Sequence, residues 1–317
     1  MIKNSSSVPP PATSALKGWI SLFRPPNLFT VPGDPLVGAL LAALALKVTP
    51  HWNSVYTVMG AALAFYASGL LANDCFDRAL DARERPNRPI PSGAVSAMAV
   101  IGVALLLSLA GILMTLPAGR TAFTIGLLLT LASWFYNAFG KGMVWLAPFS
   151  MGICRGLSLM LGAAVLGFDG LKTSAVLVAA LFMTLYIALI TLIARDEADP
   201  ESSPIPNWSR WGIPIILTTG LMYFLFQAGF PMGLHWNSLP VLMTVMSILW
   251  AALWIFQMKP NASPRLIQKS IGGLIRGLLF TQAALCATYS GAGEGFALLL
   301  LFLFPVSGWI GRWFYGS

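Results

Sequence analysis

The chain has 317 residues, of which 57% are hydrophobic and only 9% are charged. Soluble domains carry about 25% charged residues, so this composition excludes an ordinary soluble globular enzyme and an intrinsically disordered chain. The three cysteines are odd in number and lie in apolar sequence, which excludes a disulfide scaffold. The net charge of +8 comes from basic residues scattered singly between apolar runs, whereas a nucleic-acid-binding protein gathers them on one face. A polytopic membrane protein remains.

The apolar segments predict an all-α membrane protein with nine or ten transmembrane helices. Residues 1–13 are polar and Ser/Pro-rich, which predicts a disordered tail. Residues 14–23 predict a short amphipathic helix at the membrane surface, ended by Arg24-Pro25-Pro26. A span needs ~20 apolar residues, and residues 14–317 are therefore expected to form one transmembrane domain. The predicted spans are residues 28–46 (interrupted by Pro32 and Pro35), 54–74, 97–116, 121–139, 143–167, 174–194, 212–229, 239–257 and 271–290, with a last segment, 296–310, expected to span the membrane or to lie in its interface.

The basic residues predict the orientation in the membrane. With the amino terminus on the cytoplasmic side, the opposite side receives only Lys47, Arg120 and Lys172, and Arg155 and Arg276 fall inside spans. All other Lys and Arg residues then face the cytoplasm, as the positive-inside rule requires. The sequence thus predicts a multi-pass protein of the inner cell membrane, with its amino terminus in the cytoplasm.

Eight of the eleven acidic residues lie in two short segments, each at the cytoplasmic end of an even-numbered predicted span. The first segment runs from Asn73 to Glu84 and contains Asp74, Asp77 and Asp81 at positions i, i+3 and i+7. At ~100° per residue these three carboxylates share roughly a 60° arc of one helix face. They repel each other there, and arginines nearby or a bound divalent cation would offset that repulsion. The second segment is residues 195–201.

The types of donor predict the metal. Both clusters offer only hard oxygen donors, and His51 and His235 are expected on the opposite side of the membrane. Such donors fit Mg²⁺ or Mn²⁺ better than zinc or copper. Mg²⁺ commonly binds one or two carboxylates and completes its shell with water and substrate phosphate oxygens. Two metal sites bridged by a diphosphate are therefore expected; the simpler alternative is a solvated loop whose carboxylates pair with nearby arginines.

The first segment resembles the signature of the UbiA family of intramembrane prenyltransferases. Asn73-Asp-x-x-Asp77-x-x-x-Asp81 leads into Arg85-Pro-Asn87-Arg88-Pro89-Ile-Pro91-Ser92-Gly93, similar to that family's NDxxDxxxD and NRP-apolar-PSG pattern. Asp196-x-x-Asp199 stands where the family has its second acidic motif. Arg24-Pro25-x-Asn27 resembles its entry motif, and Tyr136-Asn137 with Lys141 resembles its Tyr…Lys element. The resemblance fades after about Arg210, and the tight spacing before Asn87 is similar to a divergent, EboC-like branch.

This resemblance implies a fold, an activity and site residues. The family's fold is a helical bundle around a central cavity open to lipid. Its activity is the Mg²⁺-dependent transfer of an isoprenyl group from an isoprenyl diphosphate to an aromatic or other electron-rich, lipid-soluble acceptor. Carried over by position, the metal-binding and catalytic residues are Asp74, Asp77, Asp81, Asp196 and Asp199. The residues expected to contact the diphosphate are Asn27, Asn73, Arg85, Arg88, Lys141 and Arg155.

Several features depart from the family pattern or allow two interpretations. Ser203 replaces a further carboxylate of the second motif, and Pro200 disfavours helical geometry at Asp199. Arg155 either reaches the diphosphate or an acceptor carboxylate, or it extends to the membrane interface or pairs with another helix. Asp34 either positions an acceptor or makes a structural hydrogen bond, the latter being the expected role.

Other functions remain open from the sequence. An intramembrane terpene cyclase on the same fold would keep the metal motifs, and a non-catalytic prenyl-lipid binder would tolerate the change at Ser203. A transporter is a further alternative, although transporters place such carboxylates near the bilayer midplane. Phosphotransfer from a CDP-lipid is disfavoured because its Asp-Gly-x-x-Ala-Arg signature is absent from the sequence.

Overall fold

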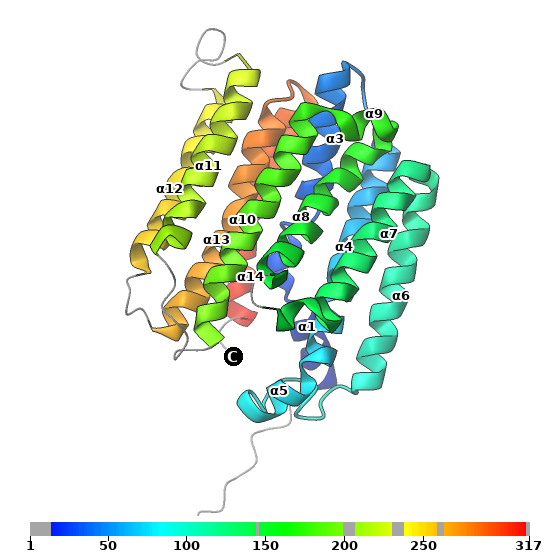
Figure 1. Cartoon of the computed structure of the whole chain (residues 1–317), viewed down its shortest axis with the longest axis vertical. Coiled ribbons are helices and arrows are strands. Elements are labelled where there is room, and N and C mark those ends of the chain that lie inside the picture. Colours follow the sequence, from blue (N-terminus) through cyan, green and yellow to red (C-terminus); the bar gives the residue numbers. More distant parts are fainter. Residues whose placement is uncertain (1–13, 144–145, 199–206, 230–237, 259–262, 315–317) are drawn as a thin grey trace, which may run out of the picture.

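The computed structural model describes residues 14–143, 146–198, 207–229, 238–258 and 263–314. The described residues form helices and connecting turns, which pack as an elongated bundle (Figure 1). The helices are α1 (Ala15–Leu22), α2 (Pro25–Leu28), α3 (Gly33–Leu46), α4 (Trp52–Phe76), α5 (Arg78–Glu84), α6 (Ala97–Thr115), α7 (Arg120–Ala138), α8 (Leu146–Ala163), α9 (Gly167–Lys172), α10 (Ser174–Ala198), α11 (Asn207–Gln227), α12 (Leu239–Gln257), α13 (Pro264–Ala287) and α14 (Ala292–Phe314).

The membrane-spanning character predicted from the sequence is confirmed. Within the described ranges, nine helical segments are long and apolar enough to cross a membrane. The final segment is among these nine, as the helix Ala292–Trp313, and α11 covers the seventh predicted span. The last helix, α14, is longer than its apolar run predicted because it extends in both directions, to Glu294 in its first turn and to Arg312 in its last.

The amino-terminal helices match their sequence signals. Ser14 caps α1, accepting a hydrogen bond from the backbone N–H of Lys17 (3.3 Å). On this helix Leu16 and Ile20 are exposed and Leu22 is buried, and its location at the membrane surface stays a prediction. The first predicted span is divided, because hydrogen-bonded turns over residues 29–32 separate α2 from α3, and the longer helix begins only at Gly33.

Helices α3 and α8 pack closely in the bundle interior because glycines face the neighbouring backbone. A Cβ atom added at Gly162 of α8 would collide with the carbonyl oxygen of Pro35, and one at Gly38 of α3 with that of Leu159. Gly152 on α8 makes a similar approach to α10. Gly156 also lies close to α10, so this G-x-x-x-G pair serves close helix packing.

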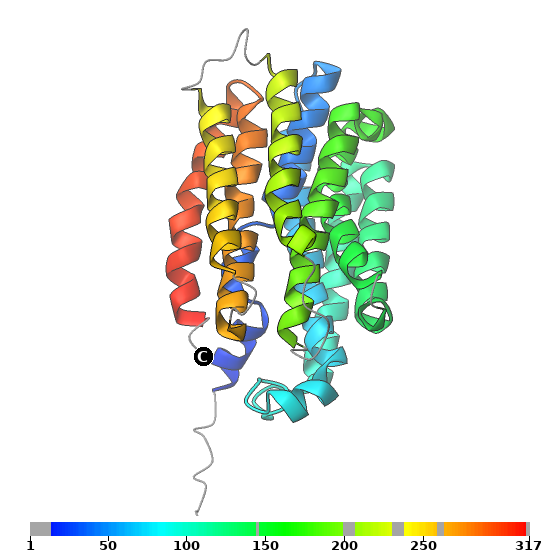
Figure 2. The ribbon, with the colours of Figure 1, turned by 60° about the vertical axis from the view of Figure 1, so that its left-hand side comes forward.

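The two views place α1, the carboxyl end of α14 and the first acidic segment at one end of the bundle (Figures 1 and 2). Helix α5 lies across that end, below the carboxyl end of α4 (Figures 1 and 2). The carboxyl ends of α10 and α14 point the same way (Figure 1). Helix α9 lies at the opposite end. The orientation of the bundle relative to the cytoplasm remains a prediction from the distribution of charge.

Candidate active site

The first acidic segment is built at the junction of α4 and α5. Asp77 is the last-turn cap of α4 and also precedes α5, and its backbone (φ −84°, ψ −2°) leaves ideal helical geometry. The backbone N–H of Asp77 still bonds to the carbonyl of Asn73 (2.9 Å), and that of Asp81 to the carbonyl of Asp77 (2.8 Å). The segment is therefore an interrupted helix, and not the single helix face that the i, i+3, i+7 spacing predicted.

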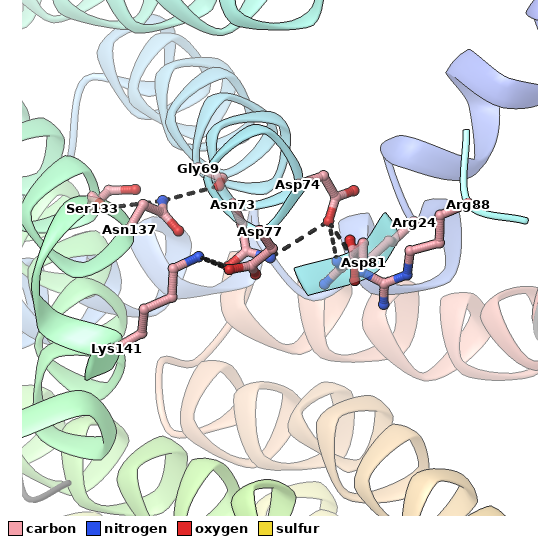
Figure 3. Close-up of polar contacts among 10 residues, drawn as sticks. All are labelled: Arg24, Gly69, Asn73, Asp74, Asp77, Asp81, Arg88, Ser133, Asn137 and Lys141. Atoms are coloured by element: carbon pink, nitrogen blue, oxygen red, sulfur yellow. Dashed lines mark hydrogen bonds and ion pairs between the residues drawn. The ribbon is translucent and has the colours of Figure 1, made fainter. Parts of the chain in front are cut away.

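Asn73, Asp77 and Lys141 form one half of the site. Lys141 lies in the short turn Gly140–Gly142 that follows α7. Its ammonium donates to Asp77 Oδ1 at 2.6 Å and to Asn73 Oδ1 at 3.3 Å (Figure 3). The side chains of Asp77 and Lys141 are each 25% exposed, so this pair is open to a ligand. The structure thus joins the acidic segment to the predicted Tyr…Lys element.

Asp74 and Asp81 form the other half and face two arginines. Arg24 Nη2 donates to Asp74 Oδ1 at 2.9 Å, and Arg88 Nη1 donates to Asp81 Oδ2 at 2.7 Å. Arg88 also lies 3.8 Å from Asp74, so the four side chains form one alternating network (Figure 3). The cavity beside them measures only about 10 Å³, room for about one water molecule.

The three aspartates are therefore not gathered around one point. Asp77 faces Lys141, whereas Asp74 and Asp81 face arginines on the other side of the segment (Figure 3). Among the residues that the structure describes, no three His, Cys, Asp or Glu side chains are close enough to hold one metal ion. This differs from the expected shared ligand set. The physical reason is that each carboxylate is neutralised by a basic partner brought from a different part of the chain.

The donors around Lys141 fit a hard cation. Asn73 Oδ1 and Asp77 Oδ1 both face the Lys141 ammonium, so a positive charge already lies between a carboxylate oxygen and an amide oxygen. These are the oxygen donors that Mg²⁺ accepts, usually with only one or two protein carboxylates. Asp77 and Asn73 are thus the residues of the described site that fit Mg²⁺ best.

The structure also places three further residues of the sequence motifs, Asn27, Arg85 and Asn137. Asn27 is half-buried on α2, one turn after Arg24, and Arg85 is exposed at the C-cap of α5. Asn137 is buried and donates to the carbonyls of Gly69 and Ser133 (3.1 and 3.0 Å), which ties α7 to α4 (Figure 3). Its role in this structure is helix packing.

Arg155 does not face the acidic segment. Its Nε lies 2.8 Å from Asp34 Oδ2, and both side chains are at least nine-tenths buried. The structure thus shows the alternative interpretation of Arg155, a pair between helices α8 and α3. The structural role expected for Asp34 agrees with this contact, since Asp34 also accepts a hydrogen bond from Gln282 (2.7 Å).

The second acidic motif falls largely outside the described residues. Helix α10 reaches Ala198 at the end of the bundle where α4 ends (Figure 1), but the side chain of Asp196 is not among those described. Asp199, with Pro200 and Ser203, lies outside the described ranges. Their assignment to a second metal site stays a prediction.

Arg24 is the site residue that sequence reasoning missed. The Arg-Pro-x-Asn motif was identified, but no role was assigned to its arginine. In the structure Arg24 has left-handed backbone geometry (φ 46°, ψ 62°) and holds Asp74. The following Pro25 and Pro26 are the signal that a fixed turn begins there.

The fold and the site together define a polytopic membrane enzyme with an ionic site at one end of a helical bundle. The model of the UbiA prenyltransferase family matches residues 35–268 of the chain. The chain therefore belongs to the UbiA prenyltransferase family, and this membership supports isoprenyl transfer as its activity.

Curated relatives agree with this membership. The chain is 30% identical over 203 residues to the digeranylgeranylglyceryl phosphate synthase of Methanosarcina mazei, an alignment covering 61% of this chain and 69% of the relative. It is 31% identical over 185 residues to the same-named enzyme of Methanothrix thermoacetophila, covering 58% of this chain but only 65% of that relative's length.

Solved structures share the fold. A UbiA homologue from Aeropyrum pernix K1 superposes with a TM-score of 0.64 at 16% identity, covering 81% of this chain and 96% of that one. A UbiA homologue from Archaeoglobus fulgidus, bound to DMAPP and Mg²⁺, gives a TM-score of 0.58 at 15% identity, covering 86% and 99%. At these identities the likeness is one of fold.

Proposed function

We propose that this protein transfers an isoprenyl group from an isoprenyl diphosphate to a lipid-soluble acceptor, aromatic or otherwise electron-rich, and releases diphosphate. The observation that carries the proposal is the alternating cluster of acidic and basic side chains at one end of an apolar bundle. Lys141, Arg24 and Arg88 supply three positive charges there, each beside a carboxylate of the first acidic segment. An isoprenyl diphosphate is complementary to this arrangement, because its negative diphosphate can face the basic side chains while its apolar chain enters the bundle.

The basic side chains suit the leaving group. In the reaction the bond between the isoprenyl C1 carbon and the diphosphate oxygen breaks, and the electron pair stays with the diphosphate. Basic groups placed before the reaction stabilise this developing negative charge without reorganising. Lys141 is suited to the role because it is partly exposed and lies beside the donors proposed for the metal.

Asp77 and Asn73 are proposed to hold Mg²⁺, with Mn²⁺ as a possible replacement, and Asp196 and Asp199 to hold a second ion. When bound, Mg²⁺ supplies Lewis acidity that stabilises charge on the diphosphate oxygens. Asp74 and Asp81 are proposed to keep Arg24 and Arg88 oriented toward the diphosphate. The Archaeoglobus fulgidus homologue is bound to DMAPP and Mg²⁺, which supports Mg²⁺ as the metal of the family.

The apolar bundle is proposed to protect the cationic isoprenyl group. Water near an allylic cation would consume it, so the group needs a dry environment. Once the C1 carbon has bonded to the acceptor, the acceptor loses a proton and remains in the membrane. The relatives are named for a glyceryl phosphate product. Acceptors carrying a phosphate group should therefore be tested beside aromatic ones.

The test uses the purified full-length chain in lipid nanodiscs with Mg²⁺ and geranyl, farnesyl or geranylgeranyl diphosphate. We expect diphosphate release that depends on an added acceptor, with a prenylated product detected by mass spectrometry. Release without acceptor, accompanied by a cyclic hydrocarbon, would indicate a terpene cyclase instead. Binding without release would indicate a prenyl-lipid binder, and passage of the lipid across the membrane without release would indicate a transporter.

A further inference from the structure

The interior of the bundle contains a buried ionic group, formed by residues outside the acidic segment, that the proposed reaction does not use. Asp34 of α3, Arg155 of α8 and Gln282 of α13 meet there, and their exposed fractions are 0%, 9% and 0%. A charge inside a membrane span is costly unless it is paired, and such residues usually serve function. Three helices distant in sequence contribute to this group, so it fixes their relative positions.

The group converges on the break between α2 and α3. Arg155 Nη2 donates to the carbonyl oxygen of Thr30 (2.9 Å) and lies 3.0 Å from Thr30 Oγ1. Gln282 Nε2 donates to the same Thr30 carbonyl at 2.7 Å. A carbonyl freed by a helix break must be satisfied in a membrane, and here two buried side chains satisfy one carbonyl. Asp34 holds both of these side chains in place.

A continuous series of hydrogen bonds leads from this break to the candidate active site. Thr30 donates to the carbonyl of Asn27 through its hydroxyl (2.9 Å) and its backbone N–H (3.2 Å). The backbone N–H of Asn27 donates to the carbonyl of Arg24 (3.0 Å). Arg24 then holds Asp74 at 2.9 Å. The short segment from Arg24 to Thr30 thus connects the interior group to the acidic segment.

The backbone of Arg24 requires such support. Its left-handed geometry is unfavourable for a residue with a side chain, costing of order 1 kcal/mol or more, and persists only where the surroundings impose it. The hydroxyl of Ser307 on α14 donates to the carbonyl of Pro26 (2.9 Å), which fixes the other side of the same segment. Both ends of α2 are therefore held by transmembrane helices.

We propose that Arg155, paired with Asp34, is a positioning residue that, together with Gln282, fixes the break between α2 and α3 and so places Arg24 at the diphosphate site. The proposal rests on the proposed function, because Arg24 matters only if the site binds diphosphate. Arg155 itself is not expected to touch the substrate. It acts through Thr30 and Asn27.

The first measurement is the position of α1 relative to α5, which requires no ligand. Spin labels at the exposed positions Lys17 and Arg83, in a chain with the native cysteines replaced, report this distance by pulsed EPR. Arg155→Lys keeps the charge beside Asp34 but lacks the planar group that reaches Asp34 and Thr30 together. We expect a broadened or shifted distance in this variant. Gln282→Leu, which keeps the ion pair, should give a smaller change of the same kind and serves if Arg155→Lys folds poorly.

The second measurement is the affinity for geranyl diphosphate with Mg²⁺ and no acceptor. Loss of one charged hydrogen bond in Arg24→Ala is expected to weaken binding about tenfold or more. Arg155→Lys should weaken binding by a smaller factor, and the double variant should bind no more weakly than Arg24→Ala, because both changes act through the same contact. Ser247→Ala removes a buried hydroxyl pair between α12 and Thr281, the residue before Gln282 on α13. It is the control for losing a buried polar contact that does not involve Thr30, and is expected to leave both readouts unchanged.

The outcomes separate the two proposals. If the label distances are unchanged in both Arg155→Lys and Gln282→Leu, or if the losses of affinity multiply in the double variant, the positioning role is overturned. Multiplying losses would mean that Arg155 acts independently of Arg24. If the wild-type chain does not bind geranyl diphosphate, the proposed function fails, and the label distances alone decide whether Arg155 fixes the break.

Discussion

The ammonium of Lys141 and the carboxylate of Asp77 lie 2.6 Å apart, although 64 residues separate them in the chain. One follows α7 and the other ends α4, so their contact depends on the packing of two transmembrane helices. The pair also contains the two types of group that the proposed reaction needs, a carboxylate for the metal and a cation for the diphosphate. The first two predictions address its members separately.

Asp77→Asn should abolish diphosphate release while the chain stays folded. Asparagine retains the shape of the side chain and one oxygen acceptor but loses the negative charge that the metal requires. Removing one electrostatic contribution of this kind typically lowers kcat by about 10²- to 10³-fold. The rate is measured in nanodiscs with Mg²⁺, and folding by thermal melting. Asp169→Asn, at a carboxyl that is 83% exposed and 4.0 Å from Lys172, is the control. Wild-type release by Asp77→Asn would overturn the metal assignment.

Lys141→Gln should weaken diphosphate binding more than it slows the reaction. The ammonium contacts the site before any bond breaks, so its loss is expected to raise KM about tenfold, the typical effect of losing a charged hydrogen bond. Lys141→Arg should restore part of the affinity because it keeps the charge. Steady-state kinetics with varied geranyl diphosphate separate KM from kcat. Lys172→Gln, at an exposed lysine next to Asp169, should change neither parameter. An unchanged KM in Lys141→Gln would show that diphosphate binds elsewhere.

Removing divalent cations should stop diphosphate release reversibly. The donors that face Lys141 are oxygens of Asn73 and Asp77, which suit Mg²⁺ and Mn²⁺. After treatment with EDTA we expect no release, recovery with excess Mg²⁺, and recovery with Mn²⁺ at lower concentration because Mn²⁺ binds such ligands more tightly. Circular dichroism should show the same helix content throughout, since the structure places these donors at the end of the bundle. Full activity in EDTA would contradict the proposal.

The sequence was sufficient to predict the helices and the location of the acidic segment. Apolar runs of span length have few alternatives in a chain with so little charge, and Ser14 and the prolines at 25 and 26 mark where the first helices begin. The weakest prediction was the final helix, whose apolar run is shorter than the helix itself. Local signals of this kind need no knowledge of tertiary packing.

The partners of the charged side chains were not predictable in the same way. The pairs Arg24–Asp74 and Arg155–Asp34 join segments distant in sequence, and their formation depends on how the helices are rotated and shifted against one another. Periodicity describes one helix at a time and contains no such information. Likewise, the spacing of Asp74 and Asp77 predicted one face only for an uninterrupted helix. Helix α4 ends at Phe76, between the two residues, and their side chains therefore point in different directions.

The tight packing of α3 against α8 gives a last prediction, on stability. Gly162→Ala would place a Cβ against the carbonyl of Pro35, in the segment that contains Asp34. Overpacking of this kind typically costs about 1–3 kcal/mol, so the thermal midpoint should fall. Gly102→Ala is the matched control: its Cβ meets nothing within 4 Å, and alanine favours a helix over glycine by up to ~1 kcal/mol. Its midpoint should stay the same or rise. A fall of equal size in both variants would show that α3 and α8 are less closely packed than the glycines indicate.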